Sequence, residues 1–340
     1  MRIAIANDGL VAAEALRRVV ATVPEYELAW IAYDGMEAVV KCAIDPPDLI
    51  LMDLLMPTMN GVEATRRIMA QSPCAVLMVT AGVHRLRAEI FEAMGYGALD
   101  VVNTPTLGNE RDSEGSLRLL AKIATIRKLL GKSRCKSVQP TLPQLPLSRR
   151  SQSSALVVIG ASTGGPQAIA TILAQLPTNF PGAIVIVQHI DAQFAPGLAE
   201  WLNHQSRLPV QLVTPGYPPQ PGRVWLAGTD HHLIMRSQHV LSYTQQPHQS
   251  FYHPSIDVFF HSVAQHWIGQ GIGMLLTGMG RDGATGLGAL RSAGWLTIAQ
   301  DQASSVVYGM PKVAAELGSA SHILPIQSIG AVLTQRLSLS

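Results

Sequence analysis

The sequence is poor in cysteine, in charge and in long hydrophobic runs, and each shortage excludes a class of protein. Three cysteines among 340 residues are too few for a disulfide framework, so we expect reduced thiols in a cytosolic protein. Charged residues make up 14% of the chain and the formal net charge is +2, which leaves no basic footprint for nucleic acid. No apolar run is long enough to cross a bilayer, and the N-terminus, MRIAIAND, lacks the apolar stretch of a signal peptide. We therefore expect a cytoplasmic protein that inserts into no membrane.

Apolar residues are abundant, at 47% of the chain, and 340 residues are enough for two domains. In both halves, short apolar runs alternate with helical patterns, which predicts two doubly wound parallel α/β sheets. The first half has five predicted strands, at residues 3–6, 28–32, 49–52, 76–80 and 99–102. The second half also has five, at residues 156–159, 183–187, 224–227, 274–276 and 296–299.

A segment without apolar periodicity separates the two halves. The stretch GKSRCKSVQPTLPQLPLSRRSQSS, residues 131–154, holds basic residues, no acidic ones and three prolines, a composition typical of a linker. We therefore expect a flavodoxin-like domain over residues 1–125, a linker over 126–154 and a Rossmann-like domain over 155–338.

Acidic residues follow two predicted strands of the first domain. Asp8 follows the first strand and Asp53 the third, and the carboxyl ends of parallel strands meet at one edge of a sheet. Two carboxylates there can hold Mg²⁺, and one can accept a phosphoryl group. Alternatively, Asp8 only caps a helix and Asp53 merely ends a strand.

The run PDLILMDLLMPTMNG, residues 47–61, resembles the phosphoacceptor segment of response-regulator receiver domains. The resemblance implies that Asp53 accepts the phosphoryl group and that a histidine kinase donates it. It also implies that the carbonyl oxygen of Leu55 joins Asp8 and Asp53 around Mg²⁺.

The first domain departs from the usual receiver pattern at three positions. Asn7 stands where receivers usually carry an acidic residue, Thr104 where they carry lysine, and Val101 at the aromatic switch position. Loss of a carboxylate weakens the attraction for Mg²⁺, and loss of the lysine removes a cation that binds phosphoryl oxygens. We hypothesise that Asp53 is still phosphorylated but that its coupling to conformation is altered or weakened.

A hydroxyl, an imidazole and a carboxylate follow three predicted strands of the second domain. Ser162 lies in VVIGASTGGPQAIATIL, His189 follows the apolar run in AIVIVQHI, and Asp282 lies in LLTGMGRDGATG. Parallel strand ends converge, so the three groups can form the Ser-His-Asp set used in acyl transfer. Taken singly, each residue also has a structural interpretation, as a helix cap or phosphate contact, a strand-end histidine and a turn residue.

Five motifs follow one another over residues 156–318: IGASTGG, VIVQHI, HPSIDVFF, LLTGMGRDGATG and IAQDQASSVVYGMP. With the receiver-like half, they resemble chemotaxis response regulator protein-glutamate methylesterases, the CheB family. The resemblance implies that Ser162 is the nucleophile, His189 the general base and Asp282 the carboxylate that orients the imidazole.

The same resemblance implies that the backbone at Thr163 and Met279 lies at the oxyanion and that catalysis uses no cofactor. The implied substrates are methylated chemoreceptor helices, whose glutamate methyl esters are hydrolysed with release of methanol and whose glutamines can be deamidated. The departures in the first domain resemble the branch of the family that serves alternative chemosensory pathways, such as Wsp-like surface sensing. A receiver docked over the strand ends would block a helical substrate, so deleting residues 1–150 is expected to raise esterase activity.

Two other interpretations need residues or spacings that this sequence lacks. A phosphate loop at 160–165 has the G-x-x-x-x-G spacing, but Pro166 replaces the lysine that such a loop requires. Metal-dependent hydrolysis lacks the H-E-x-x-H or paired-cysteine spacing, although candidate ligands exist at His231, His232, His253, Asp257 and His261. Two alternatives stay open: a receiver-controlled interaction protein with an inactive esterase half, and a small-ester serine hydrolase.

Overall fold

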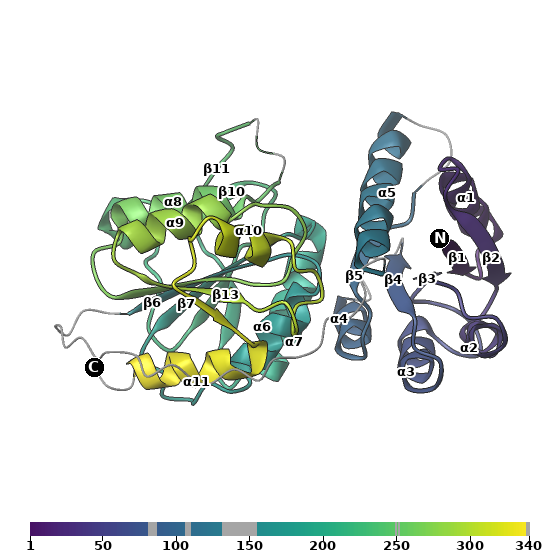
Figure 1. The fold of residues 1–340 in the computed structure, drawn as a ribbon, viewed down its shortest axis with the longest axis horizontal. Coiled ribbons are helices and arrows are strands. Elements are labelled where there is room, and N and C mark those ends of the chain that lie inside the picture. The colour runs from purple at the N-terminus through teal and green to yellow at the C-terminus, as the bar shows by residue number, and fades with distance from the viewer. Residues whose placement is uncertain (81–86, 106–109, 131–154, 249, 251, 338–340) are drawn as a thin grey trace. The chain divides into compact units, whose positions relative to one another are not determined.

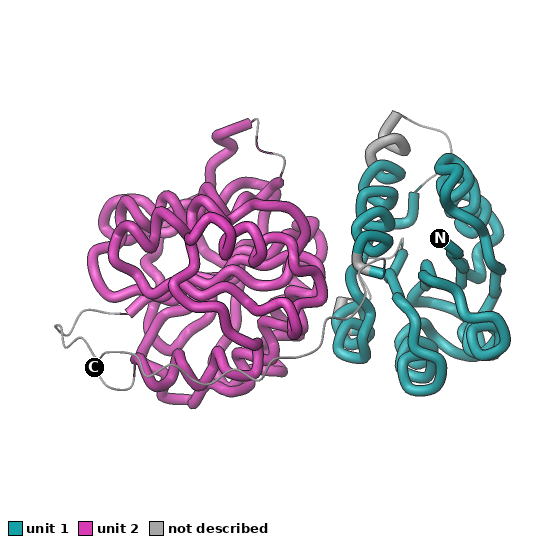
Figure 2. Tube along the Cα trace, in the orientation of Figure 1, with its two compact units in different colours: residues 1–134 teal, residues 135–340 magenta. Residues whose placement is uncertain are grey.

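The computed structural model describes residues 1–80, 87–105, 110–130, 155–248, 250 and 252–337 (Figure 1). The chain divides into two compact units, residues 1–134 and 135–340 (Figure 2). Most of the expected linker, residues 131–154, lies outside the described residues. Its first five positions belong to helix α5 (Glu110–Leu130), because Ile123 and Ile126 are both buried and continue the apolar face of that helix.

The first unit is a five-stranded parallel sheet in the order β2-β1-β3-β4-β5. Helices α1 and α5 cover one face, and α2, α3 and α4 cover the other (Figure 1). Each strand lies within one residue of its predicted position, because a fully buried parallel strand is a short continuous apolar run. The remaining bounds are β1 (Arg2–Ala6), α1 (Leu10–Ala21), β2 (Glu27–Ala32), α2 (Gly35–Ile44), β3 (Leu49–Met52), α3 (Gly61–Gln71), β4 (Ala75–Thr80), α4 (Arg87–Gly95) and β5 (Asp100–Asn103).

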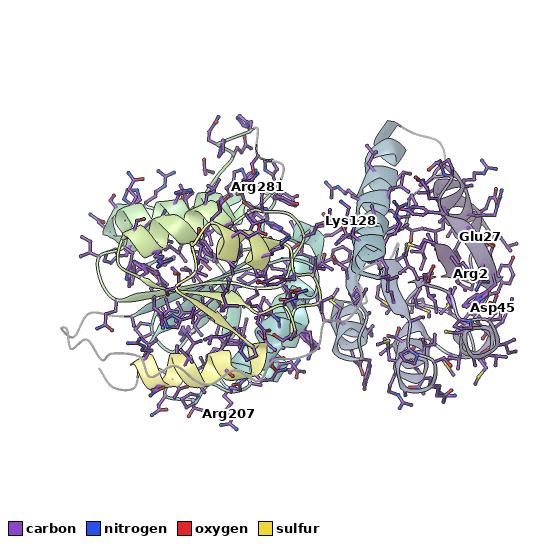
Figure 3. All side chains as sticks on the ribbon, in the orientation of Figure 1. Arg2, Glu27, Asp45, Lys128, Arg207 and Arg281 are labelled. Atoms are coloured by element: carbon purple, nitrogen blue, oxygen red, sulfur yellow. The ribbon has the colours of Figure 1, made fainter. Side chains whose placement is uncertain are left out.

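An ion pair ties the first strand of this sheet to the end of helix α2. Arg2 and Asp45, both labelled in Figure 3, are joined by two hydrogen bonds, Nη1 to Oδ1 at 2.8 Å and Nη2 to Oδ2 at 2.7 Å. Both side chains are more than a third exposed, so solvent screens the attraction between them and its contribution to stability is small.

The second unit contains a seven-stranded parallel sheet in the order β14-β13-β12-β6-β7-β9-β8. The five strands predicted for this half are β6, β7, β9, β12 and β13, and they form the centre of the sheet. The strand bounds are β6 (Leu156–Ala161), β7 (Ala183–Gln188), β8 (Val210–Leu212), β9 (Val224–Leu226), β12 (Gly271–Leu275), β13 (Leu296–Gln300) and β14 (His322–Leu324).

Four strands of this unit were not predicted. The edge strands β8 and β14 have three residues each, too short for a periodicity to show. The other two, β10 (His232–Met235) and β11 (Leu241–Thr244), form an antiparallel hairpin outside the main sheet. The hairpin packs against helix α8, a tertiary contact that the sequence pattern does not reveal.

Helices cover both faces of the seven-stranded sheet (Figure 1). One face carries α8 (Ile256–His266), α9 (Ala284–Ser292) and α10 (Met310–Glu316), and the other carries α6 (Gly165–Leu173), α7 (Ala195–Gln205) and α11 (Ile326–Leu337). Two short 3₁₀ segments, η1 (Ala192–Phe194) and η2 (Ser237–His239), complete the described elements. The central strand β6 lies between β7 and β12, so the loop that follows it is flanked by the loops that follow those two strands.

The structure also bears on the expectations about thiols and membranes. Cys42 and Cys74 are free thiols, with their Sγ atoms 3.8 Å apart. Among the described residues, no helix combines the length and the apolar character needed to cross a membrane.

Candidate functional site

Backbone pairing brings Ser162 between the loops that carry His189 and Asp282. On one side, the His189 N–H donates to the carbonyl oxygen of Ala161 at 2.9 Å, directly continuing the pairing of β6 with β7. On the other side, the Ser162 N–H donates to the carbonyl oxygen of Thr277 at 3.0 Å, beyond the end of β12. The predicted serine and histidine therefore lie at neighbouring positions on the same edge of the sheet.

His189 and Asp282 are directly hydrogen-bonded. The imidazole Nε2 lies 2.8 Å from the carboxylate Oδ2, and each side chain is about 8% exposed. A carboxylate only accepts hydrogen bonds, so Nε2 carries the proton of the neutral ring and Nδ1 has a free lone pair. Nδ1 is buried and makes no hydrogen bond within the described part of the chain. The bond between the Ser162 hydroxyl and this nitrogen is thus not formed in this structure.

The Asp282 carboxylate is held by three consecutive residues at the start of helix α8. Ser255 donates its hydroxyl to Oδ1 at 2.8 Å, Ile256 its backbone N–H to Oδ2 at 2.7 Å, and Asp257 its backbone N–H to Oδ1 at 3.1 Å. Burial by itself would raise the pKa of Asp282, but the hydrogen bonds from His189, Ile256 and Ser255 outweigh it and hold the pKa below its usual value. The carboxylate is therefore charged at neutral pH and fixed at both oxygens.

A tight turn leads from Ser162 into helix α6. The Gly165 N–H donates to the Ser162 carbonyl oxygen at 2.7 Å, and Gly164 has a φ of 76°, which favours glycine. The buried side chain of Gln188 also donates to the Ser162 carbonyl, at 2.8 Å. Gly278 packs against this turn so closely that a Cβ there would lie 2.6 Å from the Ser162 Cβ. The backbone of the predicted nucleophile is therefore held from three sides.

Of the two residues expected at the oxyanion, Thr163 lies in this turn and Met279 lies in the loop that follows β12. Thr163 is 8% exposed, and its carbonyl accepts the Thr277 hydroxyl at 2.9 Å. Met279 is half-buried and follows Gly278, whose backbone pairs with Val307 and Met310. Their role at an oxyanion stays a prediction. Arg281, labelled in Figure 3, is exposed beside Asp282.

Tyr252 is a site residue that the sequence reasoning missed. Its ring stacks on the His189 imidazole, with centroids 4.2 Å apart and planes 5° from parallel. Burial raises the pKa of Tyr252, and the charge of Asp282 raises it further. Tyr252 therefore covers one face of the predicted base, a contact between two loops that no local sequence signal reports.

Ser255 was also missed, although the sequence carries a signal for it. The segment PSIDVFF places a serine directly before an apolar helical pattern, which is typical of a helix N-cap. Ser255 is indeed the N-cap of α8, accepting the Val258 N–H at 3.4 Å. Recognising the cap would have predicted the start of the helix, but not that the same hydroxyl binds Asp282.

In the first unit, the phosphoacceptor candidate Asp53 lies at the carboxyl edge of the sheet, where it accepts hydrogen bonds from the Leu54 N–H at 2.6 Å and the Asn7 side-chain amide at 2.9 Å. Burial raises the pKa of Asp53 to about 6; the backbone N–H groups of Leu54 and Leu55 oppose the rise, and the charge of Asp8 adds to it. Asp53 and Asp8 are therefore close enough to repel one another.

The three departures from the receiver pattern have distinct surroundings. Asn7 is 1% exposed, and its Oδ1 accepts the Gly9 N–H at 2.9 Å, so its amide points a donor at Asp53. Thr104 follows β5 and donates its N–H to the Thr80 carbonyl at 3.2 Å. Val101 is a buried core residue. None of the three side chains brings a charge to this edge.

The metal-hydrolase alternative finds no support in the described residues, which contain no group of three or more histidine, cysteine or acidic side chains that could hold a metal ion. The candidate ligands have other contacts. His232 is fully buried and stacks with His253 at 4.6 Å, and Asp257 accepts the Gly286 N–H at 2.7 Å. His231 bonds with Gln245 and His261 with Thr285.

Comparisons with known proteins agree on both units. Residues 157–333 match the family described as CheB methylesterase, and residues 3–110 match the response regulator receiver domain. The chain is 54% identical to the protein-glutamate methylesterase/protein-glutamine glutaminase 1 of Bordetella avium, over 97% of this chain and 95% of that protein. It is 53% identical to the enzyme of that name from the group 3 operon of Pseudomonas putida, over 98% and 99%. The crystal structure of the Thermotoga maritima CheB methylesterase catalytic domain is 35% identical, with a TM-score of 0.52, and the match covers 54% of this chain and 98% of that one.

Proposed function

Because the chain belongs to the CheB family of protein-glutamate methylesterases, we propose that Ser162, His189 and Asp282 are the triad by which it hydrolyses glutamate methyl esters on chemoreceptor helices. The protein is an esterase with a receiver domain. The observation that carries the residue assignment is the bond between His189 and Asp282, two residues far apart in sequence, beside the turn that bears Ser162.

In the first half of the reaction, the Ser162 Oγ attacks the ester carbonyl carbon and its proton passes to Nδ1 of His189, the nitrogen that has a free lone pair. Asp282 stabilises the resulting imidazolium through Nε2. When the tetrahedral intermediate collapses, the bond to the methoxy oxygen breaks, and this oxygen takes the proton from Nδ1 and leaves as methanol. The glutamate is then an ester of Ser162. Hydrogen bonds between nucleophile and base are often absent until substrate binds, so the open Nδ1 position is compatible with this step.

In the second half, water attacks the carbonyl carbon of the Ser162 ester and gives one proton to Nδ1. When this second intermediate collapses, the Ser162 oxygen takes that proton from Nδ1 and leaves as the hydroxyl, and the glutamic acid product gives its remaining proton to solvent and becomes a carboxylate. We assign stabilisation of the oxyanion to the backbone N–H groups of Thr163 and Met279, because Thr163 lies in the turn of Ser162 and Met279 in the loop that packs against this turn, and such donors act on the developing charge. A glutamine side chain would follow the same course with ammonia as the leaving group, which supports deamidation as a second activity.

The test is methanol release from methylated receptor. Ser162→Ala should abolish release, whereas Ser292→Ala, at the exposed end of α9 where its hydroxyl donates to the Gly288 carbonyl at 3.0 Å, should leave it unchanged. Unchanged release in Ser162→Ala would refute the triad and leave the interaction-protein alternative. Rapid cleavage of small soluble esters, with methylated receptor left intact, would instead favour the small-ester hydrolase.

For the receiver domain, we propose that Asp53 accepts a phosphoryl group from a histidine kinase. Asp8, Asp53 and the Leu55 carbonyl offer the oxygen ligands that Mg²⁺ prefers, and the raised pKa of Asp53 marks a buried carboxylate that a cation would stabilise, so these residues fit the ion. When bound, Mg²⁺ supplies positive charge to the phosphoryl oxygens. The Asp53 oxygen attacks phosphorus, and the kinase histidine leaves. A phosphodonor assay in which Asp53→Asn still takes up label would refute the assignment.

We further propose that the receiver restrains the esterase and that the protein acts in the cytoplasm. The second proposal is supported by the free thiols of Cys42 and Cys74, since the cytoplasm keeps thiols reduced. Removal of residues 1–150 should raise the rate of methanol release by the remaining fragment. A folded fragment with equal or lower activity would contradict the restraint.

A further inference from the structure

His232 is a buried histidine that the proposed reaction does not use. It is 0% exposed at the start of β10. Its Nδ1 lies 3.0 Å from the backbone nitrogen of Ser255, and its Nε2 lies 3.2 Å from the carbonyl oxygen of Pro247. The N–H of Ser255 needs an acceptor and the carbonyl of Pro247 needs a donor, so only one form of the ring satisfies both: neutral, with the proton on Nε2.

Ser255 connects this imidazole to the triad. Its N–H is bound by His232, while its hydroxyl is bound by Oδ1 of Asp282 at 2.8 Å. Asp282 in turn binds His189 at 2.8 Å. One continuous chain of hydrogen bonds thus runs from the Pro247 carbonyl through His232, Ser255 and Asp282 to His189.

We infer that His232 is a positioning residue for the esterase reaction, which fixes the Asp282 carboxylate by holding the backbone of Ser255 at the start of α8. This inference rests on the proposed function, since it assigns Asp282 its role beside His189. The carboxylate takes three of its hydrogen bonds from residues 255–257, so a shift of Ser255 moves the donors of both oxygens together. A displacement of a catalytic group by about 1 Å can lower the reaction rate about 100-fold.

The surroundings of His232 keep it neutral. Burial lowers the pKa of His232, the Pro247 carbonyl opposes this, and the neighbouring His253 lowers the pKa further. His253 stacks on the His232 ring, with centroids 4.6 Å apart. The charged or titratable groups that act on His232 are His253, Asp282 and His231. A proton on Nδ1 would place two donors against one another at Ser255, which would break the chain of bonds at that point.

Three substitutions of His232 test the roles of its two ring nitrogens separately. In His232→Asn, the side-chain oxygen lies near the former Nδ1 and can still accept the Ser255 N–H. His232→Gln places its amide near the former Nε2 and loses that acceptor, and His232→Leu loses both. The measured quantity is kcat for methanol release from methylated receptor. We expect this kcat to stay within about fivefold of the native value in His232→Asn and to fall by about 10- to 100-fold in His232→Gln and His232→Leu. KM should change by less than about twofold in all three variants.

His239 provides the matched control. Its Nε2 also accepts a backbone N–H, that of Ile268 at 3.3 Å, and its ring contacts Trp267, but within the described part of the chain no hydrogen bond links it to Asp282. His239→Leu should therefore leave kcat unchanged, although it too removes an imidazole that accepts a backbone N–H. Equal kcat values in folded His232→Leu and the native protein, or equal losses in His232→Asn and His232→Gln, would overturn the inference, because a role in packing alone does not depend on which nitrogen is replaced.

A measurement on the native full-length protein covers the case in which the variants do not fold. In ¹⁵N-histidine NMR spectra at pH 7, His232 should show a bare Nδ1 and a protonated Nε2. A cationic ring, or a proton on Nδ1, would overturn the inference. The NMR measurement of the ring needs no substrate turnover. A wrong ring state therefore contradicts this inference alone, whereas the proposed esterase activity is tested separately by methanol release from the native protein.

Discussion

The aromatic ring of Tyr252 lies parallel to the imidazole of His189, 4.2 Å from it and tilted by 5°. Stacked aromatic pairs contribute about 0.5–1.5 kcal/mol beyond their buried area, so the contact favours one orientation of the predicted base. The structure therefore orients His189 in two ways, through Asp282 at its edge and through Tyr252 across its face.

Replacing Tyr252 tests the second of these constraints. Tyr252→Ala removes the ring and should lower kcat/KM for methanol release by about tenfold, the rate equivalent of about 1.4 kcal/mol. Tyr252→Phe keeps the stacked ring and should stay within about threefold of the native protein. If the two variants are equally active, stacking does not orient the base.

Gly278 offers a test of how tightly the turn of Ser162, the proposed nucleophile, is held. A Cβ at this position would lie 2.5 Å from the Met310 Sδ and 2.6 Å from the Ser162 Cβ, so Gly278→Ala overlaps both groups, and the Met310 side chain, the Ser162 turn or the Gly278 backbone must shift. We expect a loss of about 10- to 100-fold in kcat from displacement of Ser162, with the free energy of unfolding lowered by about 1–3 kcal/mol. Gly182→Ala meets the side-chain tip of Leu337 instead and should affect stability alone. Native kcat in Gly278→Ala would show that Met310 absorbs the added methyl group.

The receiver edge should gain affinity for Mg²⁺ when Asn7 is replaced by aspartate. The native Asn7 points a donor at Asp53, whereas Asn7→Asp adds a third carboxylate beside Asp8 and Asp53, and carboxylates are the favoured ligands of this ion. Calorimetric titration at neutral pH should show affinity higher by about tenfold or more. The same substitution in an Asp53→Asn background should give a much smaller gain. Equal affinity in the native protein and Asn7→Asp would place the ion elsewhere.

The pKa of Asp53 predicts how the receiver's stability depends on pH. This pKa is raised from 3.8 to about 6 in the native state, so the protonated form favours folding. The contribution is fully present below about pH 3.9, the ordinary value for aspartate, and is lost as the pH rises through about 6. A rise of about two pKa units corresponds to about 3 kcal/mol, which partial solvent screening reduces to about 1–2 kcal/mol.

Asp53→Asn should remove this loss and raise the free energy of unfolding at pH 7 by about 1–2 kcal/mol, measured by hydrogen exchange at β1 and β3 of the full-length protein without Mg²⁺. At pH 4 the two proteins should differ little. Asp34→Asn is the control, because asparagine caps a helix as well as aspartate does and Asp34 caps α2. A stability gain that is the same at pH 4 and pH 7 would contradict the explanation.

Sequence patterns predicted the central strands of both sheets, because buried parallel strands are continuous apolar runs. They also predicted that Ser162, His189 and Asp282 follow three of these strands, and the pairing of β6 with β7 and β12 brings the three loops together. What could not be predicted depends on contacts between distant loops. Tyr252 lies in the loop between β11 and α8, not directly after a strand of the main sheet, and His232 lies in a hairpin outside that sheet. Both residues reach the site only through tertiary packing. Helix α5 continues to Leu130, beyond the domain boundary expected at residue 125, which stays a prediction.

The order of strands has a consequence for synthesis of the chain. β6 is the first strand of its sheet to be made, yet it lies between β7 and β12, and Asp282, the carboxylate of the proposed triad, follows β12. A nascent chain that already contains Ser162 and His189 still lacks Asp282, the hydrogen-bond partner of the His189 imidazole. Esterase activity should therefore begin only after the segment around Asp282 has left the exit tunnel, which delays hydrolysis until nearly the whole polypeptide exists.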